Sequence, residues 1–213
     1  TAFRAIKRED PEGILIADYD MSSLKSLFLA GERTDPDTLH WAQEKLGVPV
    51  IDHWWQTETG WAIASNCMGL HPFPVKPGSP SKAAPGWDVR ILDDDCNEVS
   101  DGDIGAISVK LPMPPSSLLT LWNADERYLS AYLEDYPGYY KTSDAGYKDE
   151  DGYLYIHDRI KDMIVSGGEN VYPAEVENAL FDHPAIGDVA VIGVPDEKWG
   201  EAVKAVVVLK PSM

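Results

Sequence analysis

The chain has 213 residues, of which 44% are hydrophobic, enough apolar material for a sizeable core in one or two domains. Asp and Glu total 36 against 18 Lys and Arg, so the formal net charge is −18. Because no run of basic residues occurs, this charge argues against nucleic acid as a partner.

The first predicted elements are a strand, a helix and a second strand. Leu24–Ala30, in which only Lys25 and Ser26 are polar, predicts a buried strand, and it ends in Gly31-Glu32-Arg33. The pair Asp35-Pro36 is favourable at the start of a helix, and Gly47 is favourable at its end. Val48–Ile51 then predicts a second strand. In such a βαβ unit, ligands are expected beyond the carboxyl ends of the strands.

The middle of the chain predicts a small antiparallel β-structure. Gly69–Pro85 is rich in Pro, Gly and Lys, and we expect it to form a surface connection between subdomains. Segments of alternating polarity predict the next strands, with Asp151-Gly152 as a hairpin turn. The expected elements are strands at 87–92 and 104–109, a helix at 124–133 and a hairpin at 147–156. Together they predict a small antiparallel barrel or sheet, a β-barrel-like subdomain.

The pattern changes after Arg159, and we expect a second, smaller domain there. A glycine pair is followed by a helix beginning at Pro173, and strands are predicted at 188–194 and 202–209. The sequence therefore predicts an α/β and α+β protein with a boundary between residues 1–160 and 161–213.

Nothing in the sequence indicates secretion or a membrane. Cys67 and Cys96 are far apart and lack metal-binding spacing, which fits a reducing compartment. Residues 1–10 are rich in charge, and no run of about 18 apolar residues occurs. We expect a cytoplasmic location and no membrane span, and the sequence predicts no particular oligomeric state.

The segment Asp52–Gly60 carries the clearest chemistry, because two tryptophans run directly into a hydroxyl, a carboxylate and a glycine. Most tryptophans simply fill a core. A threonine hydroxyl at Thr57, however, can donate a hydrogen bond to a phosphate, and the Glu58 carboxylate is a suitable ligand for Mg²⁺.

Three segments resemble the motifs of one family, the adenylate-forming acyl-CoA synthetases. Trp54–Glu58 is similar to the Trp-Trp-Gln-Thr-Glu motif of the acetyl- and propionyl-CoA synthetases, and Tyr140–Gly146 resembles the ribose-binding segment. Residues 158–162, 166–170 and 175–177 resemble the hinge region. The resemblance implies the C-terminal part of the large AMP-binding domain, followed by the beginning of the small C-terminal domain.

The resemblance also implies roles for single residues. It implies Thr57 and Glu58 as catalytic residues, Glu58 as the metal ligand, Trp55 as the wall of a short acyl pocket, Lys161 as the hinge and Gly168 as the border of the coenzyme A tunnel. The implied nucleotide-binding residues are Gly31, Glu32, Arg33, Asp52, Trp54, Gln56, Thr57, Asp144, Ile156 and Arg159. We expect Trp55, Thr57 and Asp144 to share one cavity.

The chain departs from the family pattern in several places. Arg33 replaces a common proline, and Asp158 replaces the glycine before the motif arginine, which adds negative charge near the phosphates. Gly168–Pro173 resembles the medium- and long-chain branch instead of the short-chain one. No glycine-rich phosphate loop precedes residue 24 and the family's catalytic lysine is absent, so we expect a fragment that is inactive by itself.

The implied function of the complete protein is an AMP-forming carboxylate-CoA ligase for acetate, propionate or a similar acid. Its cofactors would be ATP/AMP, Mg²⁺ and coenzyme A. Three alternatives stay open: a non-catalytic AMP- or CoA-binding remnant or scaffold module, a medium-chain acyl-CoA synthetase, and an adenylation domain that loads a carrier protein. The paired tryptophans argue against the last of these.

Overall fold

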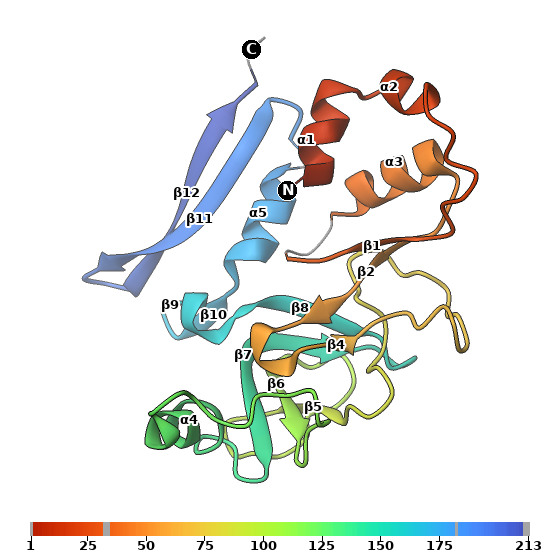
Figure 1. The fold of residues 1–213 in the computed structure, drawn as a ribbon. Coiled ribbons are helices and arrows are strands. Elements are labelled where there is room, and N and C mark those ends of the chain that lie inside the picture. Colours follow the sequence, from red (N-terminus) through yellow and green to blue (C-terminus); the bar gives the residue numbers. More distant parts are fainter. Residues whose placement is uncertain (1, 32–34, 182, 211–213) are drawn as a thin grey trace.

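The computed structural model describes residues 2–31, 35–181 and 183–210. Helices, a central antiparallel sheet and a C-terminal sheet follow one another along the chain (Figure 1). Within those ranges, none of the helices is long and apolar enough to cross a membrane.

The predicted βαβ unit is confirmed. Strands β1 (Leu27–Leu29) and β2 (Val50–Asp52) pair in parallel, and α3 (Pro36–Leu46) connects them. The Asp35 carboxylate accepts a hydrogen bond from a backbone N–H in the first turn of α3, and Gly47 ends the helix with a φ of 65°. These end signals work because each satisfies backbone groups that a helix leaves unpaired.

Two helices that the sequence analysis did not predict precede this unit. They are α1 (Ala2–Glu9) and α2 (Ile14–Ala17). Helix α2 is a single turn, too short to show helical periodicity, and its first N–H groups are capped from outside the helix. The Asp10 carboxylate accepts from the N–H groups of Ile14 and Leu15 at 2.8 and 2.9 Å.

A groove of about 500 Å³ lies beside these two helices. It is almost entirely apolar and is lined by Phe3, Ala5, Ile6, Glu9, Asp10, Leu15, Ile16, Tyr19, Met21 and Leu46. None of the residues to which a nucleotide role was assigned lines it. The groove therefore belongs to the packing surface of the N-terminal helices and not to the motif region.

The centre of the molecule is a four-stranded antiparallel sheet in sequential order. Its strands are β5 (Val89–Leu92), β6 (Gly105–Lys110), β7 (Tyr139–Lys148) and β8 (Leu154–Arg159), and α4 (Asp125–Tyr132) lies between β6 and β7 in the sequence. Among the residues that the structure describes, β8 does not pair with β5. The sheet is therefore open. Of the two expected forms, a barrel and a sheet, the structure has the sheet, and the expectation of a barrel-like closure was wrong.

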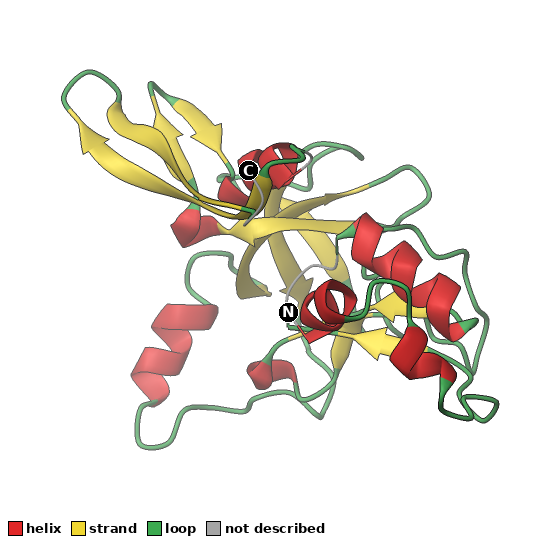
Figure 2. Ribbon diagram, turned by 90° about the horizontal axis from the view of Figure 1, so that it is seen from above, coloured by secondary structure: helices red, strands yellow, loops and turns green. Residues whose placement is uncertain are grey.

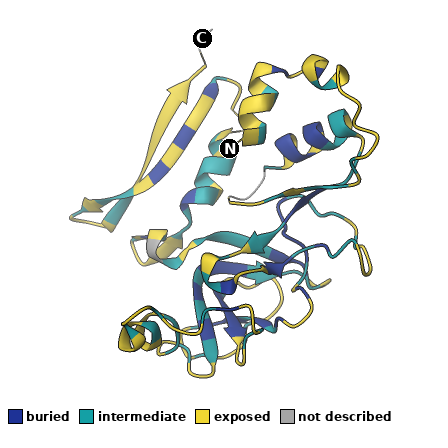
Figure 3. Cartoon of the chain, viewed as in Figure 1, coloured by how far each residue is buried: buried dark blue, intermediate teal, exposed yellow. Residues whose placement is uncertain are grey.

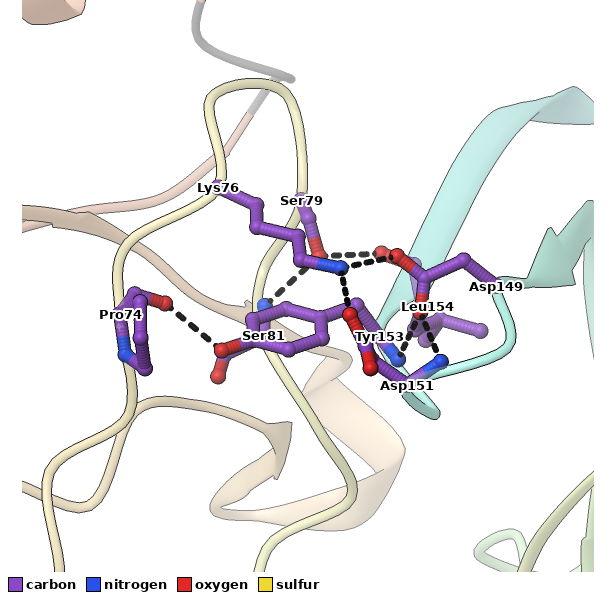
Figure 4. A network of polar contacts seen from close by, with 8 residues as sticks. All are labelled: Pro74, Lys76, Ser79, Ser81, Asp149, Asp151, Tyr153 and Leu154. Carbon is purple, nitrogen blue, oxygen red and sulfur yellow. Dashed lines mark hydrogen bonds and ion pairs between the residues drawn. The ribbon is translucent and has the colours of Figure 1, made fainter.

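The predicted surface connection, Gly69–Pro85, lies in a loop at residues 66–86, and part of this loop is buried. Residues 78–81 are buried, and Ser79 donates a hydrogen bond to the Leu154 carbonyl at 2.6 Å. Lys76 contacts Asp149 at 2.6 Å and Asp151 at 2.7 Å, and its ammonium lies over the Tyr153 ring (Figure 4). These contacts hold the loop at residues 66–86 against the turn between β7 and β8.

The tryptophan motif lies between the βαβ unit and the central sheet. Short strands β3 (Trp54–Trp55) and β4 (Ala62–Ala64) pair antiparallel, and a 3-10 turn, η1 (Thr57–Thr59), separates them. Gly60 ends this turn with a φ of 65°, and a Cβ there would lie 2.6 Å from the Ser116 carbonyl oxygen. Both the backbone angle and the close approach require glycine at this position.

The C-terminal part forms a separate sheet covered on one face by a helix (Figures 1 and 2). Its sheet order is β10-β9-β12-β11, and all the pairs are antiparallel. The elements are η2 (Ile160–Asp162), β9 (Ile164–Ser166), β10 (Glu169–Val171), α5 (Pro173–Phe181), β11 (Ile186–Asp196) and β12 (Gly200–Leu209). The three-residue strands β9 and β10 were not predicted, because they are too short for a periodic pattern. The domain boundary at residue 160 stays a prediction.

Candidate active site

Two motif side chains converge on a carboxylate that lies 90 residues away in the sequence. The Trp54 indole N–H donates to Asp144 Oδ2 at 3.1 Å, and Gln56 Nε2 donates to the same oxygen at 2.8 Å. Trp54 and Gln56 are two residues apart in an extended stretch, so both side chains leave the same face of the backbone. The fold therefore joins the tryptophan motif to the segment at residues 140–146.

Asp144 is held firmly on β7. Its side chain is only 9% exposed, and its backbone N–H donates to the Thr142 hydroxyl at 3.2 Å. Burial raises the pKa of the Asp144 carboxyl, although hydrogen bonds from Gln56 and Trp54 and the positive charge of Arg159 oppose this shift. Within the described part of the chain, Oδ1 makes no hydrogen bond, so one oxygen is free to accept from a ligand.

Arg159 lies directly across from Asp144 in the register of β7 and β8. Its side chain is exposed, and the neighbouring Asp158 carboxylate accepts a hydrogen bond from the Arg159 backbone N–H at 2.8 Å. The extra carboxylate that departs from the family pattern therefore sits beside the motif arginine. In this arrangement it contacts the backbone of Arg159.

Glu58 and Thr57 differ in how they are held. Thr57 is exposed at the start of η1. Glu58 is half-buried, and its Oε1 accepts a hydrogen bond from the Tyr132 hydroxyl at 3.2 Å. Burial and the Glu58 carboxylate raise the pKa of Tyr132, so this phenol stays protonated and is the donor.

The other residues with expected pocket roles lie in different surroundings. Asp52 is buried at the carboxyl end of β2, and Ile156 packs against the core of the central sheet. Trp55 is 46% exposed, and strand alternation directs its side chain away from that of Trp54. The shared cavity expected around Trp55, Thr57 and Asp144 stays a prediction.

The remaining candidates lie in turns. Gly31 is exposed with a φ of 101°, whereas Glu32 and Arg33 lie outside the described residues. Lys161 belongs to η2, where the central sheet leads into the C-terminal sheet, and its side chain is not described. Gly168 is exposed in the turn between β9 and β10 with a φ of 89°, a conformation that glycine adopts without strain.

The arrangement suits a metal ion that arrives with a nucleotide. The described residues contain no group of three or more His, Cys, Asp or Glu side chains that could hold an ion alone. Mg²⁺ commonly takes one or two protein carboxylates together with substrate phosphates and water. Glu58, with one oxygen bound to Tyr132 and none to a described cation, fits the role of such a single ligand.

Three residues to which the sequence analysis gave no role of their own support the site, although two of them, Tyr140 and Thr142, lie in the segment that resembles the ribose-binding motif. The Tyr140 hydroxyl donates to Gln56 Oε1 at 3.0 Å, Gln56 Nε2 also donates to the Thr142 carbonyl at 2.8 Å, and Tyr132 binds Glu58. Tyrosines in a helix and in a strand are ordinary core residues by pattern. Only their partners, which are distant in sequence, reveal what they hold.

Comparison with known proteins gives two matches to family models. A family model for AMP-binding enzymes matches residues 1–114, and a model for the C-terminal domain of AMP-binding enzymes matches residues 175–213. The chain belongs to the AMP-binding enzyme family. The expected resemblance is thereby confirmed, as is the order of a C-terminal part of the AMP-binding domain followed by the C-terminal domain.

Among curated relatives, the mitochondrial acyl-CoA synthetase short-chain family member 3 of Mus musculus is 43% identical over 99% of this chain and 31% of its own length. Acetyl-coenzyme A synthetase of Bacillus subtilis is 37% identical over 99% of this chain and 35% of its own length. The chain thus spans about a third of the length of the curated relatives it matches.

A solved structure shows the same fold with a ligand bound. The anthranilate CoA ligase AuaEII in complex with anthranoyl-AMP has a TM-score of 0.76 and 31% identity, and the match covers 92% of this chain and 36% of that chain. The chain is therefore part of a protein homologous to the AMP-forming acid-CoA ligases.

Proposed function

We propose that the full-length protein is an ATP-dependent short-chain acyl-CoA synthetase. In the first step a carboxylate oxygen attacks the α-phosphate of ATP, which forms an acyl-AMP and releases pyrophosphate. In the second step the thiol of coenzyme A takes the acyl group, loses its proton and releases AMP. The observation that carries the proposal is the convergence of Trp54 and Gln56 on Asp144, because it unites two distant motifs.

Asp144 and the residues with adenine roles are proposed to bind the nucleoside part of ATP. Asp144 would accept a hydrogen bond from a ribose hydroxyl through Oδ1, since Oδ2 is already occupied by Trp54 and Gln56. Arg159, opposite it, would bring positive charge towards the ribose and phosphates. Asp52, Ile156 and the turn at Gly31-Glu32-Arg33 would complete the adenine side.

Two neighbouring residues would act at the phosphate itself. The Thr57 hydroxyl would donate to the α-phosphate, and Glu58 would hold Mg²⁺ together with the phosphates of ATP. When bound, the ion supplies positive charge that offsets the charge developing on the phosphate oxygens. The residues of η1 thereby orient the phosphate for attack by the acid.

Trp55 would set the length of the acid. An indole at the end of the acyl pocket leaves space for two or three carbons, and a steric wall is needed because each buried methylene gains only about 0.8 kcal/mol. The short-chain relatives support this size class. Lys161 would serve as the hinge, and Gly168 would let the thin arm of coenzyme A pass close to the backbone.

The test is ATP–pyrophosphate exchange by the full-length protein with acids of increasing length. We expect exchange with acetate or propionate and a steep loss for longer acids. Trp55→Ala should move the preference to longer acids, whereas Trp122→Ala, which changes an exposed tryptophan of the loop before α4, should not. Exchange that is best with acids of about six to eight carbons would favour the medium-chain alternative.

A second measurement separates an enzyme from a binding remnant. If the full-length protein binds AMP in calorimetry but shows no exchange with any acid, the proposal of an enzyme is wrong. The alternative of a non-catalytic binding remnant is then favoured. The cytoplasmic location stays a prediction, which fractionation of cells that make the protein would check.

A further inference from the structure

The side chain of Glu58 is held by a single described partner. Its backbone is fixed, because the Leu118 N–H donates to the Glu58 carbonyl at 2.6 Å and Gly60 ends the turn. Its carboxylate has only the hydrogen bond from Tyr132, at 3.2 Å, within the described residues. The direction in which Glu58 presents its charge therefore depends on where the Tyr132 hydroxyl lies.

Tyr132 is itself placed by the core. It is in the last turn of α4, and its ring stacks on that of Tyr140 with centroids 5.5 Å apart and planes inclined by 10°. Tyr140 is fully buried at 0% exposure. A ring stacked on a buried ring has little freedom, so its hydroxyl is fixed in position.

The second ring of the stack serves the same motif. The Tyr140 hydroxyl donates to Gln56 Oε1 at 3.0 Å, and Gln56 in turn donates to Asp144. The two stacked tyrosines thus bind two motif residues that are two positions apart, Gln56 and Glu58. Gln56 binds Asp144, the proposed ribose ligand, and Glu58 is the proposed metal ligand.

We propose that Tyr132 is a positioning residue for Glu58, and that the Tyr132–Tyr140 stack aligns the ribose side and the phosphate side of the nucleotide site. The inference rests on the proposed function. A phenol orients a carboxylate without cancelling its charge, whereas a lysine or arginine would neutralise it. Glu58 makes no ion pair among the described residues, so its carboxylate can bind a cation that comes with ATP.

The experiment uses the full-length protein and the variant Tyr132→Phe, which retains the ring and removes the hydroxyl. Calorimetry measures the affinity for ATP with Mg²⁺ and with a chelator. We expect the gain in affinity that Mg²⁺ provides to fall about tenfold, because a hydrogen bond to a charged group is typically worth that much. Binding of ATP in the chelator should be unchanged.

The matched control is Tyr155→Phe. Tyr155 also stacks on a tyrosine, Tyr147, with centroids 4.9 Å apart, but among the described residues its hydroxyl makes no hydrogen bond to the motif or to Glu58. This variant should bind Mg²⁺ and ATP as the natural protein does. A similar loss in Tyr155→Phe would show that any change to a stacked tyrosine weakens the site, and the proposal would be overturned.

A double variant tests whether Tyr132 acts through Glu58. In a Glu58→Gln background, Tyr132→Phe should cause no further loss of Mg²⁺-dependent affinity or of the exchange rate at saturating ATP. An equal loss in both backgrounds, or an unchanged Mg²⁺ effect in the single variant, would overturn the proposal. If the natural protein binds Mg²⁺ and ATP but catalyses no exchange, the proposed function fails while calorimetry still decides the role of Tyr132. If it does not bind ATP with Mg²⁺, both proposals fail.

Discussion

The central sheet and the C-terminal sheet are both antiparallel and four-stranded, but they bury their residues very differently. In the central sheet, Ile107, Val109 and Tyr140 are fully buried, and the loop at 66–86 closes over the turn beside them. In the C-terminal sheet, β11 alternates between buried and exposed residues, and β12 is exposed over most of its length (Figure 3).

The difference explains which of the two sheets holds the side chains of the candidate site. Helix α5 covers one face of β11 through Val176 and Leu180, which pack against a small core. The central sheet instead provides Asp144 and Tyr140 from β7, and these two residues hydrogen-bond with Trp54 and Gln56. Side chains that must hold a ligand gain from rigid neighbours, so the site network is built on the densely packed sheet.

The largest contrast between the sheets should come from deleting core volume. Ile107→Ala removes a fully buried side chain from β6 and should cost about 4 kcal/mol of unfolding free energy. Val207→Ala, on β12 at 39% exposure, should cost less than about 1 kcal/mol. Urea unfolding followed by tryptophan fluorescence measures both, and equal losses would show that the two sheets are equally packed.

Glycine positions provide the next contrast. A Cβ at Gly146 would lie 2.0 Å from the Tyr155 carbonyl oxygen and 2.9 Å from Ile107 Cδ1, so Gly146→Ala must push β7 from β8. We expect a loss of about 3 kcal/mol. At Gly187, on β11, the nearest atoms would be 3.4 Å away, an ordinary contact, and Gly187→Ala should be nearly neutral. Thermal unfolding of the two variants decides this, and a tolerated Gly146→Ala would contradict the close packing.

A smaller effect on stability is expected from the ion pair between Lys76 and Asp149, which holds the 66–86 loop against the turn between β7 and β8. Burial alone would raise the pKa of Asp149, but hydrogen bonds from Lys76 and from the backbone of Tyr153 outweigh it and hold the pKa below its ordinary value of 3.8. The stability gained is present above pH 3.8 and is lost as the pH falls through the lower, folded-state pKa. Lys76→Met should therefore be less stable than the natural chain at pH 7, and the gap should narrow in acid.

Chemical denaturation at pH 7 and near pH 2 checks this prediction. A matched variant, Lys198→Met, removes a lysine that lies over the Trp199 ring and has no ion pair among the described residues. It should show no such dependence on pH. A constant gap between Lys76→Met and the natural chain would mean that the lysine acts by packing and not through its charge.

The smallest predicted effect concerns Asp144. Burial raises the pKa of its carboxyl, so the folded state binds a proton more readily than the unfolded state and stability falls as the pH rises through this window. Asp144→Asn carries no such proton and should gain stability relative to the natural chain between pH 4 and pH 7. Denaturation curves at both pH values measure the difference, and a relative loss at pH 7 would contradict the assigned cause.

Sequence patterns predicted the elements whose signals lie within a few neighbouring residues. Asp35-Pro36 and Gly47 marked α3 because caps act within one turn, and alternation marked β5 and β6. The motif residues were found by their resemblance to a family. The comparison confirmed the family, and the roles of the single residues stay predictions. The continuous apolar run in β12 looked the same as a buried strand would, because periodicity does not tell which face a neighbour covers.

The sequence by itself determined the family, the order of the βαβ unit and the sheets, and the candidate residues of the nucleotide site. Only the tertiary structure decided that Trp54 and Gln56 share one oxygen of Asp144, that residues 78–81 are buried, and that Tyr132 reaches Glu58. The reason is physical. Caps and alternation depend on neighbours a few residues away, whereas hydrogen bonds between residues 74 to 90 positions apart exist only after the chain has packed.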